Sequence, residues 1–299
     1  MSFPNLIAAA TILAFAGSAA SLAPAQTGAP KAPPVAAQAA KAAPKPFAPT
    51  RFSVEVVGAG PDVILIPGLT ASKEVWRGTV EAVPGYRYHL VQVAGFSGTA
   101  PRGNAQGPVV APLADEIARY IQARGLQRPA VVGHSMGGTV SMMIAARHPA
   151  RVGKVMVVDM LPEPAGLVGS TASGARGLAD ALRGLSGSES GRRIISSAIR
   201  IFGNAEAEES ESDPDVVARA THELAGLDLT PELPRIQAPL TVVYASADVN
   251  RRAAADDAYR SAYAPAKGAK LLRIDGSGHM IMYDQPARFA GALKGFLAN

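Results

Sequence analysis

One serine in this 299-residue sequence stands in a setting that makes serine nucleophilic. Ser135 is the central residue of the G-x-S-x-G pattern at 133–137, between the apolar run Ala130–Val132 and a helical pattern that starts at Met136. A sharp turn from strand to helix lifts the hydroxyl clear of the backbone, and small flanking residues tolerate such a turn. Free N–H groups at the helix start could hold an oxyanion there. We interpret Ser135 as a nucleophile; the alternative is a tight glycine turn with a capping serine.

An unassisted serine hydroxyl is a weak nucleophile, so a base must accept its proton. Of the five histidines, His279 lies in a glycine-rich loop after the last predicted strand, at the sheet edge where Ser135 is also expected. We predict that His279 is this base. The other four lie in settings typical of structural roles, namely a strand, the turn beside Ser135, a helix end and an inserted helix (His89, His134, His148 and His222).

A carboxylate should orient the histidine and stabilise its charged form. Asp248 follows a predicted strand and gives the chain order Ser135, Asp248, His279, which is typical of a strand–turn–helix nucleophile. We predict Asp248 as this acid. Asp159 is the rival, because it also follows a predicted strand and could reach the same histidine. Two carboxylates flank His279 in sequence and are expected to cap or to pair at the surface (Asp275 and Asp284).

Strand and helix patterns alternate from residue 51 onward. An amphipathic helix is expected at 109–122, and a closing helix begins near Pro286. Glycines between the first two strands favour a hairpin, so the chain is expected to open antiparallel. This alternation predicts an α/β fold with a mostly parallel central sheet and helices on both faces. The predicted strands are Phe52–Val57, Val63–Pro67, Tyr86–Val93, Pro129–Val132, Val152–Val158, Leu240–Tyr244 and Leu271–Ile274.

Residues 162–238 interrupt the alternation and contain helical patterns only. We expect helical pieces at 178–185 and 194–202 and a helix that Asp213-Pro214 opens. This segment is predicted to be an inserted helical cap. Its side chains are mainly Leu, Ile and Ala, which favours an apolar acyl substrate, although packing the cap on the core needs the same residues.

The first fifty residues are not predicted to belong to the fold. Leu6–Ala16 has the length of a signal-peptide apolar region and is too short to span a bilayer. Residues 1–25 are therefore expected to be a signal peptide, cleaved after Ala23 or Ala25, which places the protein in a bacterial periplasm or outside the cell. Residues 26–50 are rich in Ala, Pro and Lys and are expected to form a disordered tether. Phe47 is the one large apolar side chain there that could extend the domain.

Composition excludes several classes of function. Three lysines precede the first acidic residue, so residues 51–299 hold 26 basic and 24 acidic side chains, which predicts no nucleic-acid partner. The chain has no cysteine, so disulfides, thiolate metal sites and a cysteine nucleophile are excluded. No later apolar run is long enough to span a membrane, so stable membrane insertion is not expected after processing.

These motifs together resemble the α/β-hydrolase superfamily, in its serine-nucleophile, esterase- and lipase-like branch. The resemblance covers 51–299 and rests on the strand entering Pro67-Gly68-Leu69, on the motif at 133–138, on Asp248, and on Gly278-His279. It implies an oxyanion hole made by the backbone N–H groups of Leu69 and Met136. Relatives commonly have His-Gly where this chain has Pro67-Gly68, so other hydrogen bonds must brace the oxyanion loop. The stretch 94–98 also departs from the acid and tighter glycine pattern of relatives.

The expected chemistry is hydrolysis of a carboxylic ester or similar acyl compound through an acyl-enzyme, without cofactor or metal. A serine at 135 argues against the branches whose nucleophile is a carboxylate. Two alternatives remain. One is a same-fold enzyme of another reaction class, such as a perhydrolase, a lactonase or a C–C bond hydrolase, and the other is a non-catalytic binding protein.

Overall fold

The computed structural model describes residues 47–168 and 212–298. The predicted signal peptide, nearly all of the predicted tether and the cap helices expected at 178–185 and 194–202 lie outside these described residues.

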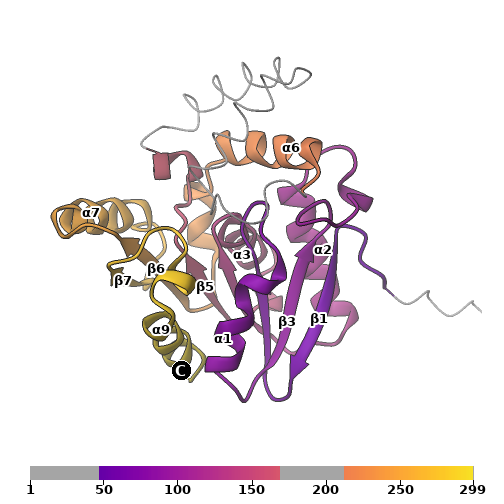
Figure 1. Cartoon of the computed structure of the whole chain (residues 1–299), viewed down its shortest axis with the longest axis horizontal. Helices are drawn as coiled ribbons and strands as arrows, with labels where there is room; N and C mark the ends of the chain where they lie inside the picture. The colour runs from indigo at the N-terminus through magenta and orange to yellow at the C-terminus, as the bar shows by residue number, and fades with distance from the viewer. Residues whose placement is uncertain (1–46, 169–211, 299) are drawn as a thin grey trace, which may run out of the picture. The chain divides into compact units, whose positions relative to one another are not determined.

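A seven-stranded sheet in the order β1-β3-β2-β4-β5-β6-β7 forms the centre of the fold (Figure 1). Only the pairing of β1 with β3 is antiparallel, and every other pair of neighbours is parallel. The mostly parallel sheet and all seven predicted strands are thus confirmed. The strands are β1 (Phe52–Gly58), β2 (Asp62–Ile66), β3 (Arg87–Val93), β4 (Ala130–His134), β5 (Lys154–Val158), β6 (Leu240–Ser246) and β7 (Lys270–Asp275).

The first strand pairs differently from the sequence-based prediction. β1 does not form a hairpin with β2; it pairs with β3, with Phe52 opposite Val93. The glycines that favoured a hairpin instead let the β1–β2 connection approach the chain just before β3. A Cβ atom at Gly58, where φ is 78°, would collide with the Tyr86 carbonyl oxygen. The hairpin prediction is therefore wrong, although β1 is antiparallel as expected.

Helices cover both faces of the sheet, because the parallel strands are apolar on both sides. In β4, Val131 packs with α2 and α3, whereas Val132 belongs to the cluster that includes α9. Both side chains are completely buried. The helices are α1 (Arg77–Ala82), α2 (Val110–Ala123), α3 (Met136–Arg147), α6 (Pro214–Ala225), α7 (Arg252–Ala262), α8 (Ile281–Asp284) and α9 (Pro286–Ala298). Short 3-10 helices lie at η1 (Lys73–Trp76), η2 (Arg102–Asn104), η3 (Pro149–Arg151), η4 (Pro164–Val168), η5 (Thr230–Arg235) and η6 (Val249–Arg251).

The helix predicted to open at Asp213-Pro214 is confirmed as α6. The Glu223 side chain of this helix binds the start of α2. The Asp213 carboxylate accepts the N–H groups of residues 215 and 216 as an N-cap. Glu223 accepts the N–H groups of Val109 and Val110, at the start of a helix that has no side-chain cap of its own. The α6 helix is therefore held to α2 by hydrogen bonds as well as by its buried apolar face.

The packed part of the chain begins before Arg51. Phe47 packs, partly buried, against the main hydrophobic cluster. Glu116 of α2 accepts the backbone N–H groups of Thr50 and Arg51, at 3.0 and 2.7 Å. Arg102 donates to the Pro49 carbonyl at 2.8 Å.

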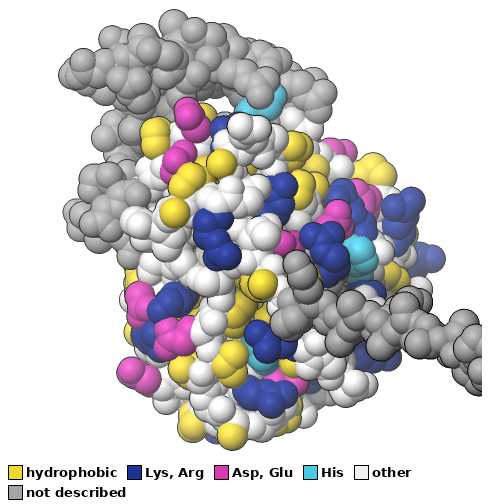
Figure 2. Space-filling model, turned by 90° about the vertical axis from the view of Figure 1, so that its right-hand side faces the viewer, with side chains coloured by type: hydrophobic (Ala, Val, Ile, Leu, Met, Phe, Trp, Pro, Cys, Tyr) yellow, Lys and Arg dark blue, Asp and Glu magenta, His cyan; other side chains and the backbone are white. Residues whose placement is uncertain are grey.

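Figure 2 shows the β1 and α2 side of the molecule, where Lys and Arg side chains stand among Asp, Glu and apolar side chains.

We predict that a chain starting at Thr50 unfolds at a lower temperature than one starting at Lys45. It loses the partial burial of Phe47, worth about 1 kcal/mol, and the hydrogen bond to Pro49. At about 2–4 °C per kcal/mol for a domain of this size, thermal denaturation followed by circular dichroism resolves the difference. The Lys45 chain should match the full-length protein, and equal unfolding temperatures for both truncations would contradict a packed role for Phe47.

Candidate functional site

Ser135 occupies a strained turn between β4 and α3. Its φ of 54° and ψ of −123° are unusual for any residue with a side chain. Its N–H donates to the Val158 carbonyl of β5 at 2.9 Å, which fixes the turn to the neighbouring strand. The predicted strand–turn–helix setting of Ser135 is therefore confirmed.

Glycines make this turn possible by allowing the backbone to pack closely. A Cβ at Gly133 would collide with the Gly137 carbonyl oxygen, and a Cβ at Gly137 would collide with the Ile66 carbonyl oxygen at the end of β2. A Cβ at Gly68 would lie only 3.2 Å from the Ser135 Cβ. The loop after β2 therefore lies directly against the serine.

His279, in the loop after β7, is paired with Asp159. The His279 Nδ1 lies 2.7 Å from the Asp159 Oδ2, although the two residues are 120 apart in sequence. Because the carboxylate can only accept, the histidine Nδ1 carries a proton, and in the neutral imidazole the lone pair is then on Nε2. This Nε2 is buried and has no hydrogen-bond partner among residues 47–168 and 212–298. In its neutral form the imidazole therefore has the tautomer that a proton acceptor requires.

Asp159 is held in place from two further sides. It follows β5 directly with a φ of 49°, and its Oδ1 accepts the Ala245 N–H of β6 at 2.9 Å and the Tyr259 hydroxyl of α7 at 3.0 Å. Burial alone would raise the pKa of Asp159, but the hydrogen bonds from His279 and Ala245 hold that pKa below its usual value. Burial and the nearby Asp159 charge raise the pKa of Tyr259 well above its ordinary value, so its hydroxyl remains a donor. Asp159 is therefore a fixed carboxylate.

The prediction of Asp248 as the partner of His279 is wrong. Asp248 is exposed, and its carboxylate accepts the Asn250 N–H at 2.9 Å as the N-cap of η6. The chain turns into this short helix after β6, so the carboxylate caps the helix and does not bind His279. Asp159 instead comes directly after a central strand and points to the histidine, as the rival interpretation allowed.

The loop that carries His279 is held by its own neighbours. Asp284 accepts the Gly278 N–H at 2.8 Å and the Ser277 hydroxyl at 3.3 Å, which confirms its expected capping role. The Gly276 N–H donates to the Ser246 carbonyl of β6 at 2.8 Å. Asp275 pairs with Arg273, as expected for a carboxylate at the surface.

His134 has a positional role that its place in the motif did not reveal. Its Nε2 donates to the His279 carbonyl at 2.9 Å, and the centroids of the two rings lie 4.7 Å apart. Burial lowers the pKa of His134 to about 3, with a further contribution from His279. His134 is therefore a neutral donor that joins the Ser135 turn to the His279 loop.

Two backbone N–H groups in the segments that flank Ser135 have no acceptor among the described residues. For the described part of the chain, neither Leu69 nor Met136 donates its backbone N–H to a protein acceptor. Leu69 lies in the loop after β2 and Met136 begins α3, so the loop and the helix start that flank Ser135 each offer one donor. This arrangement can stabilise negative charge on an oxygen bound there.

The site is built from an alcohol, an imidazole, a carboxylate and free N–H groups at one sheet edge. Within the described ranges, no three His, Asp or Glu side chains are grouped as metal ligands. No helix within those ranges is both long and apolar enough to cross a bilayer.

In comparison with known proteins, a family model matches most of the chain. The model described as "Alpha/beta hydrolase family" matches residues 63–292, which include Ser135, Asp159 and His279. A pimeloyl-[acyl-carrier protein] methyl ester esterase of Aeromonas hydrophila is 34% identical over 111 residues, covering 37% of this chain and 42% of that protein. The alignment thus spans only about two fifths of that relative's length.

Solved structures share the fold over a larger part of the chain. An enol-lactonase from Burkholderia xenovorans LB400 has a TM-score of 0.60 at 21% identity, covering 84% of this chain and 97% of that one. A thermophilic esterase from Thermogutta terrifontis has a TM-score of 0.63 at 21% identity, covering 83% and 93%. At this identity the likeness concerns the fold alone.

We predict that His134→Gln reduces the acid sensitivity of the fold. In the wild type, the unfolded chain protonates this histidine near its ordinary pKa of 6.5, whereas the folded chain resists protonation down to about 3. Lowering the pH between these values therefore favours unfolding, by up to about 1.4 kcal/mol per pH unit. Glutamine keeps an N–H donor for the His279 carbonyl but does not titrate.

Denaturant unfolding at several pH values tests this prediction. The difference in unfolding free energy between wild type and variant should change with that slope from pH 6.5 toward 3, and should be constant above about pH 7.5. A difference independent of pH would contradict a buried neutral His134.

Proposed function

The chain belongs to the alpha/beta hydrolase family, and from this premise we propose that it hydrolyses carboxylic esters through Ser135, His279 and Asp159. The observation that carries the proposal is the 2.7 Å contact of His279 with Asp159 in the loop that His134 joins to the Ser135 turn. It leaves the His279 Nε2 buried and without a hydrogen-bond partner in the described part of the chain.

In the proposed first step, His279 Nε2 takes the Ser135 proton while the serine Oγ bonds to the ester carbonyl carbon. The carbonyl oxygen becomes negatively charged and is held by the N–H groups of Leu69 and Met136. Asp159 stabilises the charged imidazole. When the intermediate collapses, the bond to the alkoxide breaks and His279 returns its proton to this leaving group, which departs as an alcohol.

In the second step, His279 takes a proton from water as the water oxygen bonds to the acyl carbon. The same two N–H groups hold the second oxyanion. The bond from the acyl carbon to the Ser135 Oγ then breaks, the serine regains a proton from His279, and the carboxylic acid is released. No electrons leave the system, so this sequence requires no oxidant or reductant.

An ester is the favoured substrate because an alkoxide leaves more easily than an amide nitrogen. The Aeromonas hydrophila relative is named as a methyl ester esterase, which supports the same class. Lactones contain the same reacting bond, and the enol-lactonase shares the fold. Product analysis on p-nitrophenyl esters of increasing chain length, a lactone and an anilide separates these substrates.

We predict that Ser135→Ala and His279→Ala each reduce ester turnover by about 10⁴-fold or more, since the groups of such a site act as a unit. A fluorophosphonate probe should label the wild type on Ser135, and labelling should be lost in Ser135→Ala. Circular dichroism verifies that the variants are folded. A folded variant that keeps more than a tenth of wild-type turnover would contradict the assignment of its residue.

The two candidate acids form a matched pair. Asp159→Asn should reduce turnover by roughly 10⁴-fold, the order expected when a histidine loses its orienting carboxylate. Asp248→Asn should reduce it less than tenfold, because this carboxylate only caps η6. Steady-state kinetics on one ester measures both, and a larger loss for Asp248→Asn than for Asp159→Asn would overturn the choice of acid.

A further inference from the structure

We propose that Ser97 is a positioning residue for the oxyanion loop, which we define as residues 67–72. The inference rests on the proposed function, because that function gives the Leu69 N–H its role. The oxyanion loop contains Pro67, which has no backbone N–H to donate, so hydrogen bonds from other segments must hold this loop. The structure supplies these hydrogen bonds from Ser97, in the loop after β3, and from Ser212, the residue before the N-cap of α6.

The oxyanion loop contains a strained turn. Leu69 and Thr70 are the two central residues of a turn that the Ala71 N–H closes on the Gly68 carbonyl at 3.3 Å. Thr70 has a φ of 63°, a conformation that side-chain-bearing residues seldom adopt and that type II turns require at this position. The turn therefore needs outside support to hold the Leu69 N–H in a fixed direction.

Two serines supply this support by donating to one carbonyl. The Ser97 hydroxyl donates to the Thr70 carbonyl at 2.8 Å, and the Ser212 hydroxyl reaches the same oxygen at 3.4 Å. The Ser97 N–H in turn donates to the Ser212 hydroxyl at 3.0 Å. Ser212 is itself fixed, because the adjacent Asp213 N–H donates to the Gly95 carbonyl at 2.7 Å. These contacts join the loops after β2 and β3 to the start of α6.

Ser97 is held in a conformation that suits glycine better than serine. Its φ is 47°, so its side chain costs stability at this position. The Ser97 hydroxyl donates to the Thr70 carbonyl of the strained turn at 2.8 Å. A hydrogen bond therefore connects two backbone positions that both have positive φ, Ser97 and Thr70 of the oxyanion loop.

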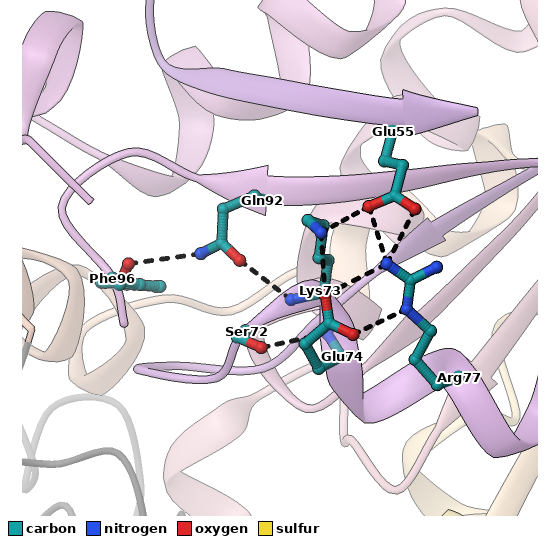
Figure 3. A network of polar contacts seen from close by, with 7 residues as sticks. All are labelled: Glu55, Ser72, Lys73, Glu74, Arg77, Gln92 and Phe96. Atoms are coloured by element: carbon teal, nitrogen blue, oxygen red, sulfur yellow. Dashed lines mark hydrogen bonds and ion pairs between the residues drawn. The ribbon is translucent and has the colours of Figure 1, made fainter. Parts of the chain in front are cut away.

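The far end of the oxyanion loop has a separate brace, so Ser97 acts on the turn itself. Gln92 accepts the Lys73 N–H at 2.9 Å and donates to the Phe96 carbonyl at 3.3 Å, as Figure 3 shows. Lys73 also contacts Glu55, and hydrogen bonds from Arg77 and Lys73 lower the pKa of Glu74 to about 2. This network anchors η1, and the Ser97 hydroxyl holds the turn between η1 and β2.

The test compares Ser97→Ala, Ser97→Gly and Ser212→Ala with the exposed control Ser53→Ala in the full-length protein. Measurements are kcat and KM on p-nitrophenyl acetate, the inhibition constant of a trifluoromethyl ketone, and the unfolding temperature. The ketone forms an adduct with the serine that places an oxyanion against the Leu69 and Met136 N–H groups. The affinity of the ketone therefore reports on the oxyanion hole independently of turnover.

Both Ser97 variants should lose about tenfold in kcat with KM little changed, and the ketone should bind about tenfold more weakly. This is less than the roughly 10²–10³-fold cost of removing an oxyanion donor outright. Ser97→Gly should unfold at the same or a higher temperature than the wild type, since glycine accepts the positive φ. Ser212→Ala should show a smaller change of the same kind, and Ser53→Ala none.

Unchanged kcat and ketone affinity in Ser97→Gly would overturn the inference, as would a change confined to KM or to the unfolding temperature. Failure of the proposed function is distinct from these outcomes. In that case the wild type would show no ester hydrolysis that depends on Ser135, and the ketone would not bind it.

Discussion

The hydrogen bond between His279 and Asp159 is the contact on which the arrangement of the site depends. It connects the loop after β7 to the end of β5, two strands that are separated in the sheet by β6. The strand between them fixes both partners: the Asp159 N–H donates to Val243 of β6, and the Gly276 N–H donates to Ser246 of β6. The position of the imidazole therefore follows from the order of the parallel strands. A register shift in β6 would displace the acid and the base together.

Strain is concentrated at the same edge of the sheet. β2, β3, β4 and β5 are each followed, within four residues, by a non-glycine residue with positive φ, and these residues are Thr70, Ser97, Ser135 and Asp159. Each such residue costs on the order of 1–3 kcal/mol and persists only where its surroundings hold it. Here hydrogen bonds supply the constraint: Ser135 to β5, Asp159 to β6, and Ser97 to the turn at Thr70.

Local sequence signals were sufficient to predict some of these features. Ser135 could be located because its turn requires glycines at fixed offsets, and the seven strands because each is a short apolar run bounded by turn residues. His279 could be located because it lies in a glycine-rich loop after the last strand, at the sheet edge where Ser135 also lies. The same reasoning yielded α6 from its proline and its capping aspartate.

Features that depend on contacts distant in sequence were not accessible in this way. Asp159 and Asp248 both follow strands, and only the turn of the chain into η6 shows that the second carboxylate is used as a cap. The pairing of β1 with β3 depends on competition between strands, which the glycines after β1 do not reveal. The His134 contact to the His279 carbonyl spans 145 residues, and the Ser97 contact to Thr70 joins two loops with no shared motif.

The most direct test of this account is proton NMR of the His279 Nδ1–H. A proton shared between an imidazole and an ionised carboxylate gives a resonance far downfield of the amide region. The wild type should show this resonance, Asp248→Asn should retain it, and Asp159→Asn and His279→Gln should lose it. If the resonance persisted in a folded Asp159→Asn protein and disappeared in Asp248→Asn, His279 would be paired with Asp248, and the site described here would be incorrect.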